Sequence, residues 1–225
     1  MTLSADELDQ LRQRLRHVCW LGGTPCSGKS TVAQQLIARY PLHLYHYDRH
    51  ERAHFARRDP ARHPTYCAEA ALSMDERWVQ RPVHALVRAT TAVWHERFGL
   101  VFDDLLALPT TAPILAEGPG LLPADVAPLL TTPQQAIWLV PTEVFKRATQ
   151  PTRGGGPASQ TSDPDRAYRH LIALDLQVAV DVRRHAEERG LTVLTVDGSR
   201  SIADTATVVA HHFGLAAPAV ADAEG

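Results

Sequence analysis

Short apolar runs alternate along the chain with longer segments in which apolar residues recur every three or four positions. The runs are bounded by glycine, proline or polar residues, and they lie at 17–23, 42–48, 112–118, 134–141 and 191–198. Runs of this length are typical of buried strands, and the spacing between them is typical of amphipathic helices. Because strands that alternate with helices build parallel sheets, the pattern predicts an α/β domain with helices on both faces of the sheet.

The segments between the predicted strands differ in what they can build. Residues 49–110 are predicted to be mostly helical, which makes them the longest segment without a strand. The stretch 150–164, QPTRGGGPASQTSDP, has too few large apolar residues to pack a core and predicts a mobile loop. Residues 214–225 predict a flexible tail at the end of a single domain that spans 1–225.

Composition and charge exclude several classes of protein. A hydrophobic fraction of 44% and a charged fraction of 21% are ordinary for a globular protein, and a net charge of -2 gives no basic field for nucleic acid. No apolar run approaches the roughly 18 residues of a membrane span, and the first residues lack the apolar stretch of a secretory signal. The three cysteines have no metal-site spacing and no even pairing, so we expect a cytoplasmic protein that binds neither nucleic acid nor membrane.

The most specific motif is G-x-x-x-x-G-K-S, which lies between the first predicted strand and a predicted helix. Its glycines let successive backbone N–H groups point into one concavity, where they bind phosphate oxygens. Lys29, expected to be exposed at the helix start, would reach the β- and γ-phosphates, and Ser30 would ligate Mg²⁺. The predicted nucleotide-binding residues of this loop are Gly23, Thr24, Pro25, Cys26, Ser27, Gly28, Lys29, Ser30 and Thr31.

Cys26 lies inside this loop and has two interpretations. A helix N-terminus lowers the pKa of a nearby thiol, so Cys26 could be a redox-sensitive group beside the anion site. The other interpretation, which we favour, is a small spacer residue.

Five segments in order resemble the small P-loop kinases. They are GGTPCSGKST, then YHYD at the end of the second predicted strand, ILAEG on the third, an arginine-bearing loop after the fourth, and TVDGSRSIAD after the fifth. The family includes nucleoside-monophosphate, shikimate, gluconate and uridine kinases and chloramphenicol phosphotransferase. The resemblance covers 17–50, 112–170 and 190–213 but not 51–110.

The resemblance implies a fold and two cofactors. The fold is a three-layer sandwich whose five-stranded parallel sheet has the order 2-3-1-4-5, and the cofactors are ATP and Mg²⁺. Residues 49–110 would form a helical acceptor-binding region, and residues 142–170 would form a lid.

Two acidic residues follow predicted strands. In kinases of small alcohols an aspartate at the position of Asp48 contacts the acceptor hydroxyl and can act as the base; alternatively, Asp48 caps the following helix. Glu117 would hold Mg²⁺ through water and face the substrate, or it is a solvated carboxylate at a strand end.

Arginines and a polar turn complete the expected nucleotide site. By resemblance, lid arginines clamp the migrating phosphoryl group, with Arg153 as the catalytic one and Arg147 on the nucleotide; Arg166 and Arg169 flank the same loop, and any of the four could instead be solvated. The turn Asp197, Gly198 and Ser199 resembles the loop that lines the adenine ring, although an ordinary strand–turn–helix would look the same.

The segment after Asp48 is rich in histidine and arginine. Arg49 and Arg52, or Arg57 and Arg58 after them, are candidates to bind the acceptor and would favour a phosphorylated or carboxylated molecule. His50 and His54 have a spacing that can bind zinc, but no nearby ligands complete a set. A solvated helix face is the simplest alternative for the whole segment.

We therefore expect an ATP- and Mg²⁺-dependent kinase of a small-molecule acceptor, most simply through a hydroxyl group. A nucleotide or nucleoside acceptor is the first alternative. A non-catalytic nucleotide-binding regulator or partner-dependent NTPase is the alternative from another class, and nucleic-acid end phosphorylation is disfavoured by the charge. The sequence leaves monomer and homodimer both open.

Overall fold

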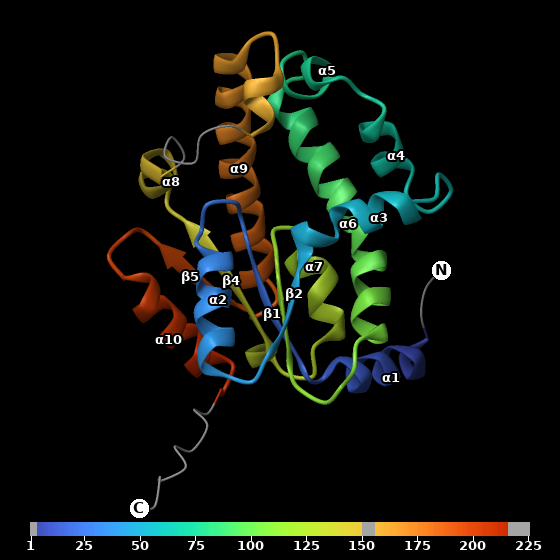
Figure 1. The fold of residues 1–225 in the computed structure, drawn as a ribbon, viewed down its shortest axis with the longest axis vertical. Helices are drawn as coiled ribbons and strands as arrows, with labels where there is room; N and C mark the ends of the chain where they lie inside the picture. Colours follow the sequence, from blue (N-terminus) through green and yellow to red (C-terminus); the bar gives the residue numbers. More distant parts are fainter. Residues whose placement is uncertain (1–3, 150–155, 216–225) are drawn as a thin grey trace, which may run out of the picture.

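The computed structural model describes residues 4–149 and 156–215 (Figure 1). Arg153 and nearly all of the predicted tail lie outside these residues. Within them no helix is long and apolar enough to cross a membrane.

The five predicted strands form one parallel sheet in the order β2-β3-β1-β4-β5, which confirms the expected architecture. β1 is central and pairs Trp20 with Ala116 on one side and with Ala136 on the other. The strands are β1 (Val18–Gly23), β2 (His43–His46), β3 (Ile114–Glu117), β4 (Ala136–Pro141) and β5 (Thr192–Val196). β1, β3 and β4 are buried on both faces, which explains their continuous apolar runs.

Alternate residues of the central strand point into two separate cores. Trp20 packs in the larger core, and Leu21 packs in the smaller core on the opposite face. The larger core is covered by α1 (Ala5–Leu15), α6 (Val83–Ala107), α7 (Pro123–Val126) and α9 (Pro164–Glu187). The smaller core is covered by α2 (Lys29–Arg39) and α10 (Ile202–His212). The molecule is therefore a three-layer sandwich.

The segment between β2 and β3 is helical, as expected, and its short helices before α6 stand beside one half of α6 (Figure 1). Glu96 on α6 accepts hydrogen bonds from the backbone N–H groups of Thr65 (2.9 Å) and Tyr66 (2.8 Å), and so fixes the start of α4. The elements before α6 are η1 (Tyr47–His50), α3 (Glu51–Arg57), α4 (Pro64–Ala70) and α5 (Met74–Trp78).

The described end of the expected mobile loop differs from the prediction. Residues 157–160 form the 3-10 helix η5 (Pro157–Gln160), where Ala158 is buried against Val79 and Ala167. The Ser162 N–H donates to Asp75 Oδ1 at 2.7 Å. Small buried side chains are sufficient for this packing, whereas the prediction counted only large apolar residues.

The remaining elements of the described chain are α8 (Glu143–Thr149), which follows β4, and the 3-10 helices η2 (Ala127–Leu129) and η3 (Pro133–Gln135). α8 begins where the Thr142 hydroxyl accepts a hydrogen bond from Phe145 N at 3.2 Å. Because β4 runs parallel to β1, the end of β4 where α8 starts lies at the same sheet edge as the glycine-rich loop after β1.

Candidate functional site

The loop after β1, residues 23–31, is called the phosphate loop below. It turns on three left-handed residues: Gly23 (φ 127°), Cys26 (φ 65°) and Gly28 (φ 82°). At Gly23 a Cβ atom would lie 2.1 Å from the carbonyl oxygen of Leu139, so only glycine fits there. Gly28 is the N-cap of α2 and offers no side chain to the helix, which leaves the first N–H groups of α2 to face the loop.

Lys29 is buried, and our expectation of an exposed side chain is wrong. Its side chain is 6% exposed because it folds back across the loop, where Nζ donates to the Thr24 carbonyl at 2.7 Å and lies 3.4 Å from Ser27 Oγ. Burial lowers the pKa of Lys29 to about 8, against an opposing effect of the nearby Glu117 carboxylate.

A cavity of about 150 Å³ lies between the phosphate loop and the ends of β2 and β3. It brings together residues that the sequence placed in one site: Ser30, Thr31, Asp48 and Glu117 all line it, beside Lys29. These residues converge because the carboxyl ends of parallel strands meet at one edge of the sheet.

Glu117 ends β3 and is only 1% exposed. Its Oε1 lies 3.0 Å from His46 Nε2, yet this oxygen is buried without a hydrogen bond. Burial raises the pKa of Glu117, while His46, Lys29 and the Ser30 hydroxyl act in the opposite direction. The solvated strand-end alternative therefore does not fit the structure.

The donors around this cavity fit a magnesium ion. Mg²⁺ in phosphate-binding sites is held by one or two protein oxygens, by water and by the phosphates themselves. Ser30 and Glu117 supply such oxygens, and the buried Oε1 of Glu117 accepts no hydrogen bond, its nearest charged neighbour being His46. In the described part of the chain no three His, Cys, Asp or Glu side chains form a metal-binding group, so a cage made of side chains alone is not found there, nor is the zinc site considered for His50 and His54.

Asp48 lies two residues beyond the end of β2, inside η1, because the strand stops at His46 rather than at the predicted residue 48. Its side chain is exposed and lines the cavity of the phosphate loop. The capping alternative is not observed, since the N-cap positions of η1 and α3 are His46 and His50 and neither helix has a side-chain cap. The Asp48 carboxylate is therefore free to meet a ligand.

Tyr47, the residue before Asp48, is fully buried. Added Cβ atoms at Gly118 and Gly120 would each lie 2.2 Å from Tyr47, so both positions must be glycine for the tyrosine side chain to fit. The guanidinium carbon of Arg97 lies 4.1 Å from the centre of the same ring. The signal for this packing was the repeated glycine after Glu117, which the sequence argument did not use.

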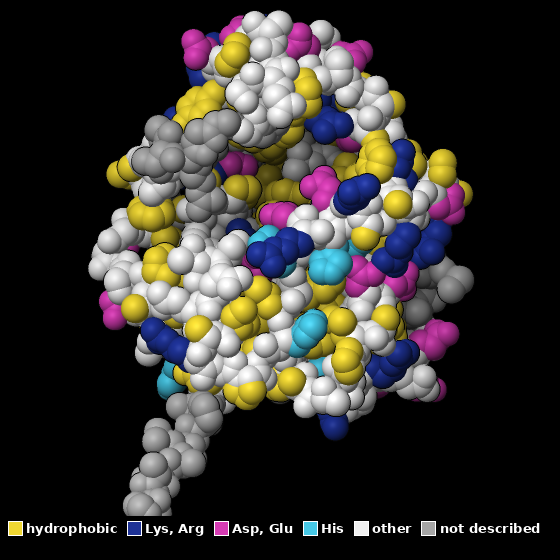
Figure 2. Space-filling view, in the orientation of Figure 1, with side chains coloured by type: hydrophobic (Ala, Val, Ile, Leu, Met, Phe, Trp, Pro, Cys, Tyr) yellow, Lys and Arg dark blue, Asp and Glu magenta, His cyan; other side chains and the backbone are white. Residues whose placement is uncertain are grey.

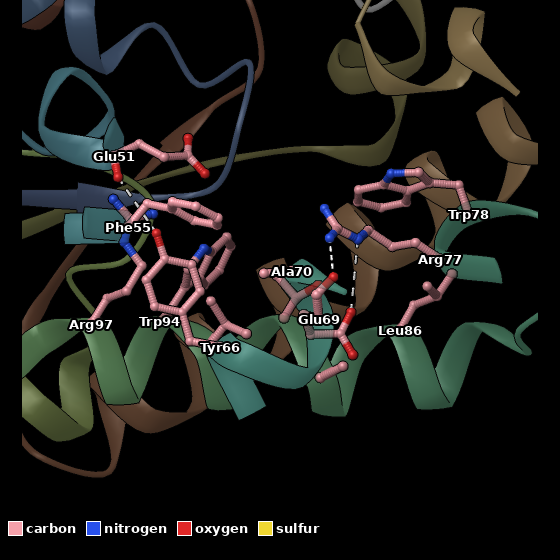
Figure 3. A pocket seen from close by; sticks show the side chains of 13 residues that line it. Glu51, Phe55, Tyr66, Glu69, Ala70, Arg77, Trp78, Leu86, Trp94 and Arg97 are labelled. Atoms are coloured by element: carbon pink, nitrogen blue, oxygen red, sulfur yellow. Dashed lines mark hydrogen bonds and ion pairs between the residues drawn. The ribbon is translucent and has the colours of Figure 1, made fainter. Parts of the chain in front are cut away.

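The second cavity, of about 220 Å³, lies between α3, α4, α5 and α6. Figure 3 shows aromatic side chains of Phe55, Tyr66 and Trp94 near Arg97 at one end and the Glu69–Arg77 pair at the other. Figure 2 shows this face of the molecule hollowed, with apolar side chains inside and charged ones at the rim. We call this space the helical cavity.

Lys146 is a functional candidate that the sequence did not single out. It is 1% exposed on α8, and its Nζ donates to the carbonyl oxygen of Pro25 at 2.9 Å and pairs with Asp175 on α9. Burial raises the pKa of Asp175, an effect that Lys146 opposes. Lys146 thus joins two helices to the phosphate loop, through a residue that belongs to no motif.

The three expected lid arginines that the structure describes do not line the cavity of the phosphate loop. Arg147 is 58% exposed and pairs with Glu143, its neighbour on α8, at 2.7 Å. Arg166 and Arg169 are exposed on the first turns of α9. Arg153 lies outside the described residues, so its predicted role stays a prediction.

The turn expected at the adenine ring lies at the carboxyl end of β5. Asp197 Oδ1 accepts hydrogen bonds from Ser199 N (2.9 Å) and Ser199 Oγ (2.6 Å), which lowers the pKa of Asp197. A Cβ at Gly198 would lie 3.1 Å from the Phe145 ring, which places this turn against α8. A Cβ at Gly28 would lie 3.2 Å from Ile202, so the start of α10 also reaches the phosphate loop.

Arg49 and Arg52 are exposed on η1 and α3. Arg49 borders a different cavity, next to His43 and Arg57, and neither arginine lines the cavities described above. The structure instead places Arg97 of α6 in the helical cavity.

Comparison of the chain with protein-family models gives no match, and a search of curated proteins gives none either.

Proposed function

We propose that this chain transfers the γ-phosphoryl group of ATP to a hydroxyl group of a small molecule. The observation that supports this most strongly is the cavity in which the phosphate loop, Ser30, Asp48 and Glu117 meet at one edge of the sheet. This arrangement holds a loop for phosphate, oxygens for a cation and a free carboxylate for an acceptor within one space.

The phosphate loop would bind the triphosphate through its N–H groups and Lys29. Lys29 Nζ is held by the Thr24 carbonyl, and it would exchange this oxygen for a phosphate oxygen. Lys29 would then balance the charge that develops on the transferring group. Ser30 and Glu117 would hold Mg²⁺, which supplies further positive charge to the phosphates when bound.

Asp48 is the residue suited to the acceptor. As the acceptor oxygen bonds to the γ-phosphorus, the bond from that phosphorus to the β–γ bridging oxygen breaks, ADP leaves, and the hydroxyl proton passes to the Asp48 carboxylate. The exposed position of Asp48 supports this role, since no protein group competes for its oxygens in the described structure.

The test measures transfer of labelled γ-phosphate from ATP to classes of acceptor: sugars and other alcohols, hydroxylated carboxylates, nucleosides and nucleotides. The wild type should turn over with one class, and Lys29→Ala should abolish transfer without loss of the fold. Arg39→Ala, at the exposed far end of α2, is the matched control and should behave as the wild type.

Two outcomes would redirect the proposal. ATP hydrolysis that no acceptor class changes would favour a nucleotide-binding regulator or a partner-dependent NTPase. Turnover with nucleotides that is indifferent to Asp48 would favour a nucleotide kinase, because a phosphate acceptor arrives already ionised.

A further inference from the structure

Arg97 is a buried cation that lacks a carboxylate partner. It is 4% exposed, and no carboxylate of the described residues lies within ion-pair distance of its guanidinium group. Nη2 reaches the Tyr47 carbonyl at 3.5 Å and His54 Nδ1 at 3.4 Å, both at the limit of a hydrogen bond, and Nε is buried with no partner. Buried arginines are ordinarily paired, so this one has unused capacity for an anion.

Of the two arginines that line the helical cavity, Arg77 already has a carboxylate neighbour, although its Nε is also buried without a hydrogen bond. Arg81 pairs with Glu69 at 2.7 Å, and Arg77 contacts the same carboxylate at 3.9 Å and its backbone carbonyl. Glu51 also lines the cavity but forms no ion pair with Arg97. Among the described residues, Arg97 is thus the arginine of the cavity lining that has no carboxylate within ion-pair distance, and it is the cation that we assign to a ligand.

Arg97 is held in a fixed position. The Tyr47 ring lies against one side of its guanidinium group, 4.1 Å away, and the Tyr66 ring lies 5.7 Å away. His54 is fully buried, and its Nε2 lies 2.8 Å from Asp104 Oδ2. Because Nδ1 of His54 faces the Nη2 donor of Arg97, the proton belongs on Nε2, where it is donated to Asp104. The histidine is then neutral and orients Arg97 without cancelling its charge.

The helical cavity lies next to the proposed site of transfer. The carbonyl that Arg97 contacts belongs to Tyr47, the residue before Asp48. Glu51, three residues after Asp48, lines the helical cavity, while Asp48 lines the cavity of the phosphate loop. The short segment from Asp48 to Glu51 therefore borders both cavities.

The walls of the helical cavity suit a flat apolar body. Phe55, Tyr66 and Trp94 present rings near Arg97 (Figure 3). Aromatic side chains stack on planar groups, and a guanidinium group pairs with carboxylate or phosphate oxygens. Both features occur at the same end of one cavity.

We propose that the helical cavity binds the phosphoryl acceptor, and that the acceptor is a small molecule with a planar apolar part and an anionic group, carboxylate or phosphate, which pairs with Arg97. This assignment rests on the proposed kinase function and names its substrate class. It replaces Arg49 and Arg52 by Arg97 as the acceptor-binding cation.

The test uses benzoate and phenyl phosphate as probes, with benzamide and benzyl alcohol as their uncharged counterparts. Binding is measured by calorimetry to the full chain, with the phosphate loop filled by Mg²⁺ and a non-hydrolysable ATP analogue. The same titration on Lys29→Ala, in which the phosphate loop is impaired, shows whether an anion binds there instead. The tighter of the two anions identifies the carboxylate or the phosphate class.

We expect both anions to bind the wild type at least tenfold more tightly than their uncharged counterparts, and Arg97→Met to remove this preference. Arg97→Lys should restore part of it. Arg88→Met, the same change at an exposed position of α6, is the matched control and should bind as the wild type. Equal affinity for charged and uncharged probes, or no binding of either anion to the wild type, overturns the proposal.

Two further measurements distinguish failure of this proposal from misfolding of the variant and from failure of the kinase function. If Arg97→Met does not fold, Thr90→Met fills the helical cavity without touching Arg97 and should abolish binding of both anions; retained binding overturns the proposal. If the ATP analogue fails to bind the wild type while the anions bind through Arg97, the kinase function fails and the anion site remains.

Discussion

Lys146 Nζ lies 2.9 Å from the carbonyl oxygen of Pro25, so α8 holds the phosphate loop by its backbone. The same amine pairs with Asp175, which carries the link onward to α9. We therefore expect this buried pair to hold the phosphate loop in position rather than to contact a ligand directly.

Replacement of Lys146 by methionine should therefore affect both stability and nucleotide affinity. Asp175 would be left buried and unpaired, and the loss of one partner of a buried ion pair costs about 3–5 kcal/mol of unfolding free energy. Lys146→Met with Asp175→Leu should recover most of this stability. Urea unfolding measures the first effect and calorimetry with an ATP analogue the second. Full nucleotide affinity in the double variant would show that the contact with Pro25 does not position the loop.

Lys29→Met should stabilise the protein in the absence of nucleotide while abolishing transfer. The pKa of Lys29 falls from 10.5 to about 8 on folding, so below pH 8 the folded state carries the cost of a buried charge. A shift of this size corresponds to about 3 kcal/mol, and the lost hydrogen bond to Thr24 offsets part of it. Between pH 8 and 10.5 the unfolded state binds more protons, so wild-type stability rises with pH and the difference from the variant shrinks. Urea unfolding at pH 7 and pH 10 measures it; a difference that does not change with pH would contradict the burial of a charge.

Asp48→Asn should lower turnover with the true acceptor by roughly 10²-fold or more, the scale of a general base. ATP affinity should stay within a few-fold, and the melting temperature should not change, because Asp48 is exposed and caps no helix. Steady-state kinetics check the first effect. Asp103→Asn, at an exposed position of α6, is the control. Wild-type turnover in Asp48→Asn would remove the alcohol-kinase mechanism.

Gly120→Ala should destabilise the fold through Tyr47. The new Cβ would lie 2.2 Å from Tyr47 Cζ, and overpacking of this kind costs about 1–3 kcal/mol. In Tyr47→Leu the crowded ring atoms are gone, so Gly120→Ala should cost little in that background. A double-mutant cycle measured by urea unfolding tests the coupling. Additive effects would mean that Tyr47 is not the neighbour that requires glycine.

Much of the fold followed from hydrophobic patterning, because strands buried on both faces leave continuous apolar runs. Strand ends were predicted less well: β2 stops at His46, because Tyr47 is as apolar as a strand residue but belongs to η1. The convergence of Asp48 and Glu117 on the phosphate loop could be predicted, because the carboxyl ends of parallel strands lie at one edge of the sheet.

Three features of the candidate site could not be predicted from the sequence. Lys29 is buried because of a hydrogen bond to its own loop, which depends on the conformation around Cys26. Arg97 and Lys146 belong to no motif, and each gains its meaning from partners far away in the sequence: Tyr47 and His54 for Arg97, Pro25 and Asp175 for Lys146. The sequence of a helix shows which residues are charged, but it does not show which cavity each charged side chain faces.

The chain contains two lysines, Lys29 and Lys146, and both are buried against the phosphate loop. Amine-reactive labels consequently have no surface lysine to modify. Apart from the α-amino group, acylation by such a reagent would report on the opening of this one loop. Mass spectrometry of acylation at these two lysines would thus report ligand binding in the wild-type protein, without an engineered probe.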